Sequence, residues 1–288
     1  MASFSDESFN ASNYLAFRPT YSPTLAQTIV DYHTQRPGNQ LGLAVDLAAG
    51  TGQMCNALSP HFDQVYGLDV STTMLEAAAP LPNVVYAVSP AEGPWDARIA
   101  PGSVDLVTIS QAVHYFKRPD VWQQIRRMLK PGGTLAIFSY SFMSFPGKPQ
   151  ATRLLWDLGL NPAKYGDLWD AGRKDVDILY GDWDIPFANV QRLYSSAALV
   201  SPARALPSSE QSGAPETFIQ RDLTPAQLEA YLHTWSAGKH YVARNPGHTT
   251  LVEDTVQQMM DGEGCPNRDQ PWAVEWNNVL ILGQNPSS

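Results

Sequence analysis

The chain has 288 residues, 43% of them hydrophobic and 16% charged, which is typical of a globular protein with a sizeable core. Its formal net charge of −9 argues against nucleic acid or an anionic membrane as a partner. Cys55 and Cys265 lack the spacing of a metal site, so we expect no metal, no disulfide framework and a reducing, cytoplasmic location. No run of the sequence reaches the ~18 apolar residues of a membrane span, and the polar N-terminus lacks the apolar segment of a secretory signal.

The first part of the chain combines a polar arm with one helix. Residues 1–22 carry five aromatic side chains, more than a disordered arm usually has, so we expect the arm to pack against the protein. Ser22 followed by Pro23 is typical of a helix start and predicts a helix from Pro23 to about Gln35. We expect residues 1–40 to form an arm and a helix that cover the functional site.

Short apolar runs then alternate with segments that favour helices. The sequence predicts strands at 41–47, 64–69, 83–88, 103–110 and 134–140, with helices at 52–58, 71–79 and 120–129. Alternation of this length predicts a doubly wound, Rossmann-like and mostly parallel α/β sheet with right-handed crossovers. Ligands of such sheets bind at the carboxyl ends of the strands, so residues 41–140 are the expected cofactor-binding core.

The pattern changes after residue 140. Residues 141–186 contain many Trp, Gly, Pro and Asp residues and show only short helical candidates, while Lys130-Pro-Gly-Gly133 reads as a turn before the fifth strand. Further elements are expected as strands at 187–194 and 272–282 and as helices at 224–232 and 252–260. We expect residues 141–288 to complete a seven-stranded sheet and, with the N-terminal arm, to form a helical cap over the substrate.

The first predicted strand ends in a turn punctuated by glycines, Val45-Asp-Leu-Ala-Ala-Gly-Thr-Gly52. A phosphate-binding loop needs a lysine or open backbone N–H groups, because its ligand is anionic. This turn has no lysine, and Asp46 would repel a phosphate. An acid beside a turn that lets a ligand approach the backbone instead suits the ammonium group of a cofactor such as S-adenosylmethionine.

A second acid, Asp69, ends the second predicted strand nineteen residues after Gly50. An acid at about this spacing accepts hydrogen bonds from the ribose hydroxyls of an adenosine-containing cofactor. The pattern fits nicotinamide cofactors as well, but their Gly-x-Gly-x-x-Gly motif is absent because no glycine follows at position 55. S-adenosylmethionine is therefore the expected cofactor.

Four motifs in this order resemble those of class I S-adenosylmethionine-dependent methyltransferases, namely Val45–Gly52, Gly67–Ser71, Met74-Leu75 and Leu129–Leu135. Flanking segments are similar to the trans-aconitate methyltransferase-like group, namely Phe9-Asn10, Tyr14, Arg18–Tyr21, Gln111–Phe116 and Tyr231–Ala237. That group methylates small carboxylic acids and related metabolites. The resemblance therefore implies a Rossmann-like methyltransferase that acts on a small molecule.

The resemblance also implies a set of cofactor-binding residues, namely Tyr14, Arg18, Asp46, Ala48, Gly50, Gly52, Asp69, Val70, Met74, Ala91, Glu92 and Gln111. Of these, Asp46 and the backbone of the two glycines would meet the methionine moiety. Asp69 would hold the ribose, and Val70 and Met74 would cover the adenine, with Ala91 and Glu92 at its edge. Gln111 would lie on the sulfonium side. Arg18 would pair with a carboxylate of either the cofactor or the substrate.

Two positions depart from the family pattern. The usual first glycine of the loop is Ala48, whose methyl group is accommodated if this residue keeps φ below zero. The acid often found after the third strand is replaced by Ser89-Pro90, so Glu92 or Gln111 would have to meet the adenine amino group.

The expected substrate-binding residues follow the fourth strand or come from the flanking segments, namely Tyr21, His114, Tyr115, Trp235 and Tyr241. His114 is the candidate catalytic residue, as a substrate contact or as a conditional general base. A carboxylic acid has already lost its proton at neutral pH and needs no base, whereas a phenol, an alcohol or a protonated amine does.

The sequence favours methyl transfer to a carboxylate oxygen of a small acidic metabolite by a monomeric enzyme. One alternative keeps the cofactor but takes a hydroxyl, amine or thiol of a secondary metabolite as the acceptor. Another is a cofactor-binding protein of this fold that transfers no methyl group, which the unusual residues Ala48 and Pro90 keep open.

Overall fold

The computed structural model of the protein describes residues 19–170, 172–195 and 218–286. Within these residues, eight strands form one sheet in the order β3-β2-β1-β4-β5-β8-β6, with β7 beside β8. The strands are β1 (Leu43–Leu47), β2 (Gln64–Asp69), β3 (Val84–Val88), β4 (Val104–Ser110), β5 (Leu129–Ser144), β6 (Ala188–Tyr194), β7 (Gln220–Leu223) and β8 (Trp272–Gln284). Strands β1 to β5 are parallel, and β8 is antiparallel to its three neighbours. The predicted Rossmann-like, mostly parallel fold is confirmed, with β7 as an eighth strand.

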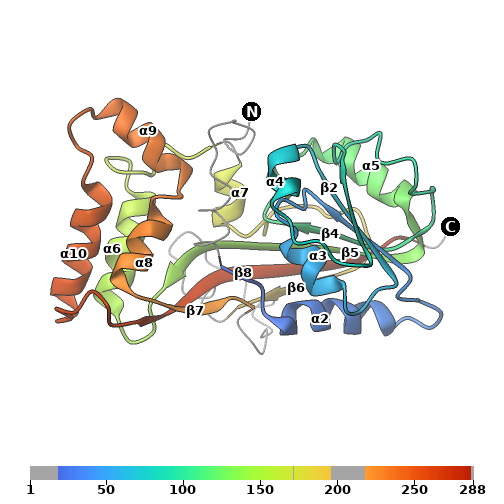
Figure 1. Ribbon diagram of the computed structural model, residues 1–288, viewed down its shortest axis with the longest axis horizontal. Coiled ribbons are helices and arrows are strands. Elements are labelled where there is room, and N and C mark those ends of the chain that lie inside the picture. The colour runs from blue at the N-terminus through green and yellow to red at the C-terminus, as the bar shows by residue number, and fades with distance from the viewer. Residues whose placement is uncertain (1–18, 171, 196–217, 287–288) are drawn as a thin grey trace.

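The helices form two groups that lie at opposite ends of the long strands β5 and β8 (Figure 1). The core group consists of α2 (Pro23–Thr34), α3 (Gln53–Leu58), α4 (Thr72–Glu76), α5 (Arg118–Met128) and the short 3₁₀ helix η2 (Val113–Tyr115). The other group, which we call the cap, consists of α6 (Pro149–Leu160), α7 (Arg173–Asp177), α8 (Pro225–Leu232), α9 (Ser236–Arg244) and α10 (Leu251–Gly262). Of the cap helices, α7 lies nearest to the core group (Figure 1).

The structure corrects two local predictions and adds one helix. Residues 141–186 contain a twelve-residue helix, α6, rather than short candidates only, because its apolar side chains fall on one buried face (Ala151, Leu155, Leu158). The helix predicted at 224–232 is confirmed as α8, and a separate helix that was not predicted, α9, begins at Ser236. Strand β5 begins at Leu129, so Lys130-Pro-Gly-Gly133 lies within the strand at an irregularity of the β4–β5 pairing instead of forming a turn before it.

The central strands bury both of their faces. On β1, Ala44 contributes to the core cluster that contains α2, α3 and much of the cap, while Val45 contributes to the cluster that contains α5. Successive residues of a strand point to opposite faces, which explains this division. Among the described residues, no helix combines the length and apolar character that a membrane crossing requires.

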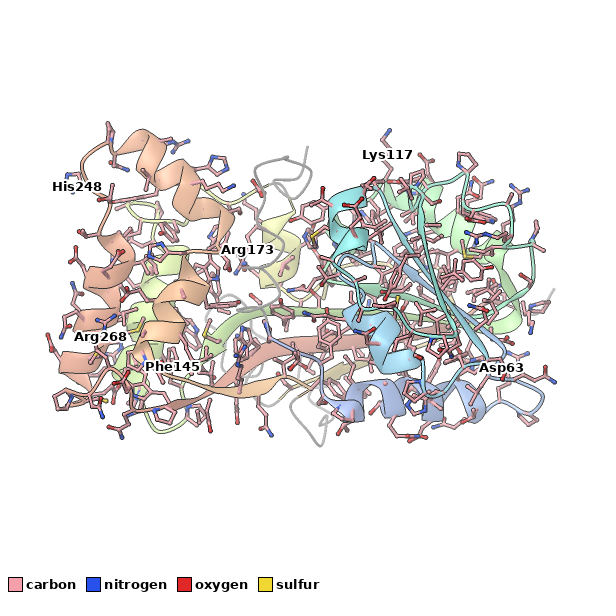
Figure 2. The ribbon with its side chains drawn as sticks, viewed as in Figure 1. Asp63, Lys117, Phe145, Arg173, His248 and Arg268 are labelled. Carbon is pink, nitrogen blue, oxygen red and sulfur yellow. The ribbon has the colours of Figure 1, made fainter. Side chains whose placement is uncertain are left out.

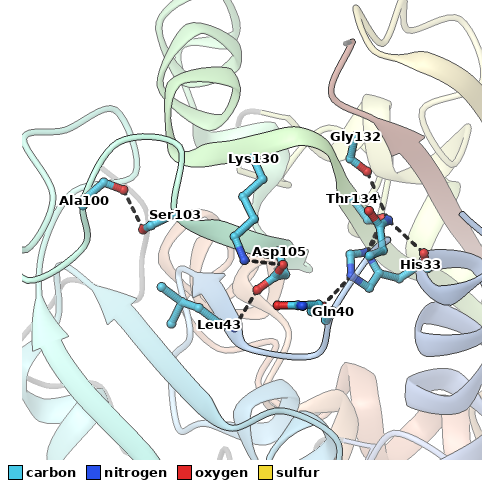
Figure 3. Close-up of polar contacts among 10 residues, drawn as sticks. His33, Gln40, Leu43, Ala100, Ser103, Asp105, Lys130, Gly132 and Thr134 are labelled. Atoms are coloured by element: carbon cyan, nitrogen blue, oxygen red, sulfur yellow. Dashed lines mark hydrogen bonds and ion pairs between the residues drawn. The ribbon is translucent and has the colours of Figure 1, made fainter. Parts of the chain in front are cut away.

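The amino ends of three strands are tied together by one buried acid, Asp105 (Figure 3). Its Oδ1 accepts a hydrogen bond from Lys130 Nζ at the start of β5 over 2.7 Å, and its Oδ2 accepts one from the backbone N–H of Leu43 at the start of β1 over 2.9 Å. These contacts lie at the edge of the sheet opposite the functional site. Lys130 belongs to the Leu129–Leu135 motif of the sequence analysis, and we assign it a role in holding the strands of the sheet together.

Candidate functional site

A cavity of about 430 Å³ lies at the carboxyl ends of the parallel strands, between the core and the cap. Asp46 of β1, Asp69 of β2, Ser110 of β4 and Tyr140 of β5 line it from the sheet. The cap contributes a second set of lining residues, namely Trp169, Asp170, Arg173, Val176, Tyr231, Trp235 and Ser236. The strand order reverses between β1 and β4, which is the position where ligands of open α/β sheets bind. The volume is in the range of small-molecule sites.

Asp46 is a buried acid without a cationic partner among the described residues. Its Oδ1 accepts a hydrogen bond from Thr108 Oγ1 over 2.7 Å, and its Oδ2 accepts one from Cys55 Sγ over 3.7 Å. Burial raises the pKa of this carboxyl from 3.8 to about 7, against the opposite effect of the two hydrogen bonds. An ammonium group placed at Asp46 would restore its charge, which fits the predicted contact with a methionine moiety.

The turn after β1 has left-handed backbone conformations at Ala48, Gly50 and Gly52. Ala48 has a φ of 56°, so the predicted condition that it keeps φ below zero is not met. The backbone at Ala48 has the left-handed conformation that a glycine would adopt. The methyl group makes this conformation less favourable by about 1–2 kcal/mol. Gly50 lines the cavity. Gly52 does not, and a Cβ at Gly52 would lie 2.1 Å from Tyr86 Oη, so this glycine is needed for packing under the loop.

Asp69 is fixed in place by two backbone donors. Its Oδ2 accepts a hydrogen bond from the N–H of Gly50, and its Oδ1 accepts one from the N–H of Ser71, both over 2.8 Å. Each oxygen keeps a further acceptor site. The carboxylate is thus oriented at the cavity before any ligand arrives, in the manner that recognition of a ribose diol requires.

The predicted adenine site is mostly apolar. Met74 and Ala91 are buried at the cavity wall, whereas Val70 lines the cavity with 64% of its surface exposed, a large exposed fraction for an apolar side chain. Glu92 also lines the cavity, and its Oε1 accepts a hydrogen bond from the N–H of Lys117 over 3.0 Å. Its second oxygen has no contact among the described residues and suits an adenine amino group.

Gln111 is held by the fold. Its Nε2 donates to the carbonyl of Tyr140 over 2.8 Å, while its Oε1 accepts hydrogen bonds from Ser139 Oγ and from the N–H of Tyr140. The amide oxygen therefore has no acceptor site left for an adenine amino group. Of the two residues predicted for that contact, the geometry favours Glu92, and Gln111 lines the cavity as a rigid part of its wall.

These residues together fit S-adenosylmethionine. The cavity offers an acid for an ammonium group, an oriented acid for a ribose and an apolar wall for a base. Ser110 also lines the cavity, and its Oγ is buried without a hydrogen-bond partner among the described residues. A bound cofactor can supply this hydrogen bond.

His114 lies in η2 at the boundary between core and cap. Its Nδ1 shares a hydrogen bond with Tyr180 Oη over 2.7 Å, and Tyr180 Oη lies 3.2 Å from Ser139 Oγ. Burial, aided by the charge of Arg173, lowers the pKa of the imidazole from 6.5 to about 3. His114 is therefore neutral at physiological pH, in whichever tautomer the bond to Tyr180 selects.

Arg173, at the start of α7, is a cavity residue that the sequence analysis missed (Figure 2). Its guanidinium lies over the rings of Phe142 and Trp169, with centroid distances of 4.2 and 4.1 Å. Its Nε donates to Asp177 Oδ1 over 2.6 Å, and its Nη2 is buried without a partner among the described residues. The segment before Arg173 is rich in Trp, Gly and Asp, which sets it apart from the rest of the sequence. Its sequence contains no periodic pattern, however, from which a position near the strand ends could be predicted.

The structure places the other predicted residues as follows. Tyr21, Tyr115 and Trp235 line the cavity with His114. Tyr241 lines a separate cavity of about 420 Å³ inside the cap, so it is not brought to the predicted substrate site. No residue of α2 lines the site, although Tyr21, two residues before the start of this helix, does. Tyr14 and Arg18 lie outside the described residues.

Comparison with known proteins agrees with this geometry. Residues 45–137 match the family model of a methyltransferase domain. A Dictyostelium discoideum protein named as a methyltransferase is 32% identical over 189 residues, which cover 65% of this chain and 69% of that protein. A Saccharomyces cerevisiae protein named as a probable S-adenosylmethionine-dependent methyltransferase, CRG1, is 23% identical over 288 residues, which cover 97% of each chain.

The fold is shared as well. A type II methyltransferase from Anaeromyxobacter dehalogenans has a solved structure that matches with a TM-score of 0.71 at 23% identity, over 94% of this chain and 100% of the other. The family match, the relatives and the cavity lead to one conclusion. The chain belongs to the S-adenosylmethionine-dependent methyltransferases, and S-adenosylmethionine is its cofactor.

Proposed function

We propose that the enzyme transfers the methyl group to a carboxylate oxygen of a small organic acid, the acceptor class that the trans-aconitate methyltransferase-like resemblance implies. The observation that carries this proposal is the guanidinium of Arg173 in the cavity wall. Among the described lining residues, Arg173 is the one lysine or arginine. Its position opposite the cofactor-binding strands makes it the natural partner of an anionic acceptor.

The contacts of Arg173 leave its terminal nitrogens for a ligand. Asp177 occupies Nε from the side, and the two aromatic rings cover the faces of the guanidinium. Nη1 and Nη2 have no hydrogen-bond partner among the described residues, and Nη2 is buried. An unpaired buried donor of this kind is costly, and a carboxylate can satisfy both nitrogens in a bidentate pair.

The environment of His114 supports the same acceptor class. A base with a pKa near 3 takes up a proton poorly at neutral pH, so it is badly suited to activate an alcohol, a phenol or an ammonium group. A carboxylate needs no such help, since it is already ionised. The cofactor, when bound, supplies an electrophilic methyl group on a sulfonium. The chain then has to place the acceptor oxygen in line, and orientation of this kind supplies several kcal/mol.

The proposal assigns three roles to the residues of the wall. Arg173 binds and orients the acid through its terminal nitrogens. Neutral His114, held by Tyr180, limits the space beside the acid and offers one ring nitrogen as a contact. The aromatic side chains of the cap exclude water, which strengthens the pairing between the guanidinium and the acid.

An acceptor screen with labelled cofactor tests the proposal. Purified protein is incubated with S-adenosylmethionine labelled in the methyl group and with matched acids, alcohols, amines and thiols of the same carbon skeleton. We expect label in the acids. Arg173→Met should lower kcat/KM for the acid at least a hundredfold, and Arg173→Lys should restore part of it, because an ammonium group cannot pair bidentately.

Affinity for S-adenosylhomocysteine, measured by calorimetry, shows whether each variant keeps its fold, and it should change less than threefold. Arg268→Met is the matched control, because Arg268 is also a cap arginine paired with a carboxylate, that of Glu229, but it lies away from the cavity. Transfer to the alcohol, amine or thiol in preference to the acid, or full activity of Arg173→Met, would contradict the proposal.

A further inference from the structure

The charges around the cavity are strongly unbalanced. Four described lining residues carry carboxyl groups, namely Asp46, Asp69, Glu92 and Asp170, against the single guanidinium of Arg173. Asp46 and Asp69 lie on the core side, so Arg173 and Asp170 are the charged groups that face the acceptor from the cap. Asp170 lies 3.4 Å from His240 Nε2. Among the described lining residues, a second carboxylate on the acceptor would meet no further cation and would approach Asp170.

Apart from Val176 and Ser236, the remaining cap residues that line the cavity are aromatic. Trp169, Tyr231 and Trp235 line the cavity, and their rings pack in series, with centroids 5.1 Å apart for Trp169–Trp235 and 6.2 Å apart for Tyr231–Trp235. Phe142 and Tyr165 support these rings from behind, each within 6.3 Å of both tryptophans. This support fixes the position of the ring surfaces that face the cavity.

Two of these three side chains use their polar atoms in hydrogen bonds with residues of the protein. Trp169 Nε1 donates to the carbonyl of Gly159 over 2.8 Å, and Tyr231 Oη accepts a hydrogen bond from Trp276 Nε1 over 3.2 Å. Trp169 therefore presents ring carbon atoms to the cavity and has no N–H left to bind a polar substituent of the acceptor.

We propose that the acceptor is a monocarboxylic acid with an aromatic, apolar body, whose carboxylate pairs with Arg173 and whose ring lies against Trp169 and Trp235. This inference rests on the proposed function and narrows it. One cation matches one carboxylate, and a fixed aromatic wall favours another aromatic ring through offset or edge-to-face contacts. The same charges disfavour acids with two or three carboxylates, because each further carboxylate would be desolvated without a cationic partner among the described residues.

Matched acids test separately the two features of this proposal, the single carboxylate and the aromatic ring. Phenylacetate and 3-phenylpropanoate represent the proposed class. Their cyclohexyl analogues keep the carboxylate and the size but lose the aromatic ring, and their 4-carboxyphenyl analogues keep the ring but add a second carboxylate. Tricarballylate represents the aliphatic polyacids. The readouts are kcat/KM for labelled methyl transfer and the equilibrium affinity of each acid for the protein saturated with S-adenosylhomocysteine.

We expect kcat/KM and affinity to be three- to tenfold higher for the phenyl acids than for the cyclohexyl acids, and at least a hundredfold higher than for the dicarboxylates and tricarballylate. Trp169→Leu should remove most of the preference for the phenyl ring while keeping the discrimination against a second carboxylate. Trp156→Leu is the matched control, because Trp156 is also a half-buried cap tryptophan whose Nε1 donates to a backbone carbonyl, that of Met143, but it does not line the cavity.

The outcomes distinguish this inference from the proposed function. Preferred methylation of tricarballylate or of the dicarboxylates would overturn the inference and leave carboxylate methylation standing. Equal use of phenyl and cyclohexyl acids, or an unchanged preference in Trp169→Leu with intact binding of S-adenosylhomocysteine, would also overturn it. If none of the acids accepted the methyl group while 2-phenylethanol or phenylethylamine did, both this inference and the proposed function would be overturned.

Discussion

Asp46 shows how one residue links the stability of the protein to its cofactor. Its carboxyl has a pKa of about 7 in the folded protein and 3.8 as the ordinary value. Between these pH values the folded chain holds a proton that the unfolded chain has lost. The free energy of unfolding therefore falls as the pH rises from about 4 toward 7, by an amount on the order of 4 kcal/mol. Binding an ammonium group at Asp46 offsets this loss, because it favours the charged carboxylate.

We predict that Asp46→Asn weakens binding of S-adenosylhomocysteine at least tenfold at pH 8 and removes most of the pH dependence of binding. In the natural protein, affinity should rise between pH 6 and 8, as the carboxyl loses its proton. Calorimetry over this range, with thermal unfolding of the unliganded protein, measures both effects. Asp63→Asn is the control, because Asp63 is exposed and lies away from the cavity (Figure 2). Unchanged affinity in Asp46→Asn would show that the ammonium group binds elsewhere.

Residue types could be assigned to the cofactor site from the sequence, but their conformations could not. The sequence placed Asp46, Asp69 and Gly50 correctly at the cavity, because their spacing reflects the strand ends of a known kind of sheet. It did not reveal that Ala48 and Gln111 have φ values of 56° and 58°, since such conformations of non-glycine residues are imposed by tertiary contacts. The polar contacts of Gln111 with β5 are of the same kind.

At the scale of elements, Lys130 and Asp105 hold the starts of β1, β4 and β5 together (Figure 3). We predict that Lys130→Met lowers the free energy of unfolding by about 2 kcal/mol, because it leaves a buried carboxylate without its cation. Urea unfolding measures the change. Lys117→Met, an exposed lysine near the carboxyl ends of the strands, should change it by less than about 0.5 kcal/mol.

The double variant Lys130→Met with Asp105→Asn should recover part of the loss, since the unpaired charge is then gone. Equal stability of Lys130→Met and the natural protein would mean that the ion pair contributes nothing to holding the strands. Affinity for S-adenosylhomocysteine should stay the same in Lys130→Met and in the double variant, because the ion pair lies at the amino ends of the strands, away from the cavity.

Elements with a strong local pattern were predicted well. Strand β2 and the start of α8 at Thr224-Pro225 are examples, because a period of two and a hydroxyl before proline are local signals. Helix α7 has only five residues, and β7 has four. Segments this short depend on the elements they pack against, which explains why the sequence did not reveal them.

At the scale of the whole molecule, the site is built from a core half and a cap half. The sequence predicted the core half well and the cap half poorly. The core half follows a repeated strand and helix pattern, so its ligand-binding edge could be located from the sequence. The cap half supplies Arg173, Trp169 and Tyr231 from segments far apart in the chain, and only the packing of α6 to α10 around the long strands β5 and β8 brings them to the cavity. The cofactor was therefore predictable, whereas Arg173 and Trp169, which we propose to contact the acceptor, were recognised only in the structure.

The central claim is the kind of bond that the enzyme makes, and the base lability of the product tests it most directly. Protein is incubated with S-adenosylmethionine labelled in the methyl group and with phenylacetate or tricarballylate, and the labelled product is then treated with dilute hydroxide. A methyl ester hydrolyses under these conditions, so we predict that the label is released as volatile methanol in the wild-type reaction and that Arg173→Met yields almost none. A labelled product that keeps its methyl group in hydroxide, as an ether, an amine or a thioether does, would contradict carboxylate methylation.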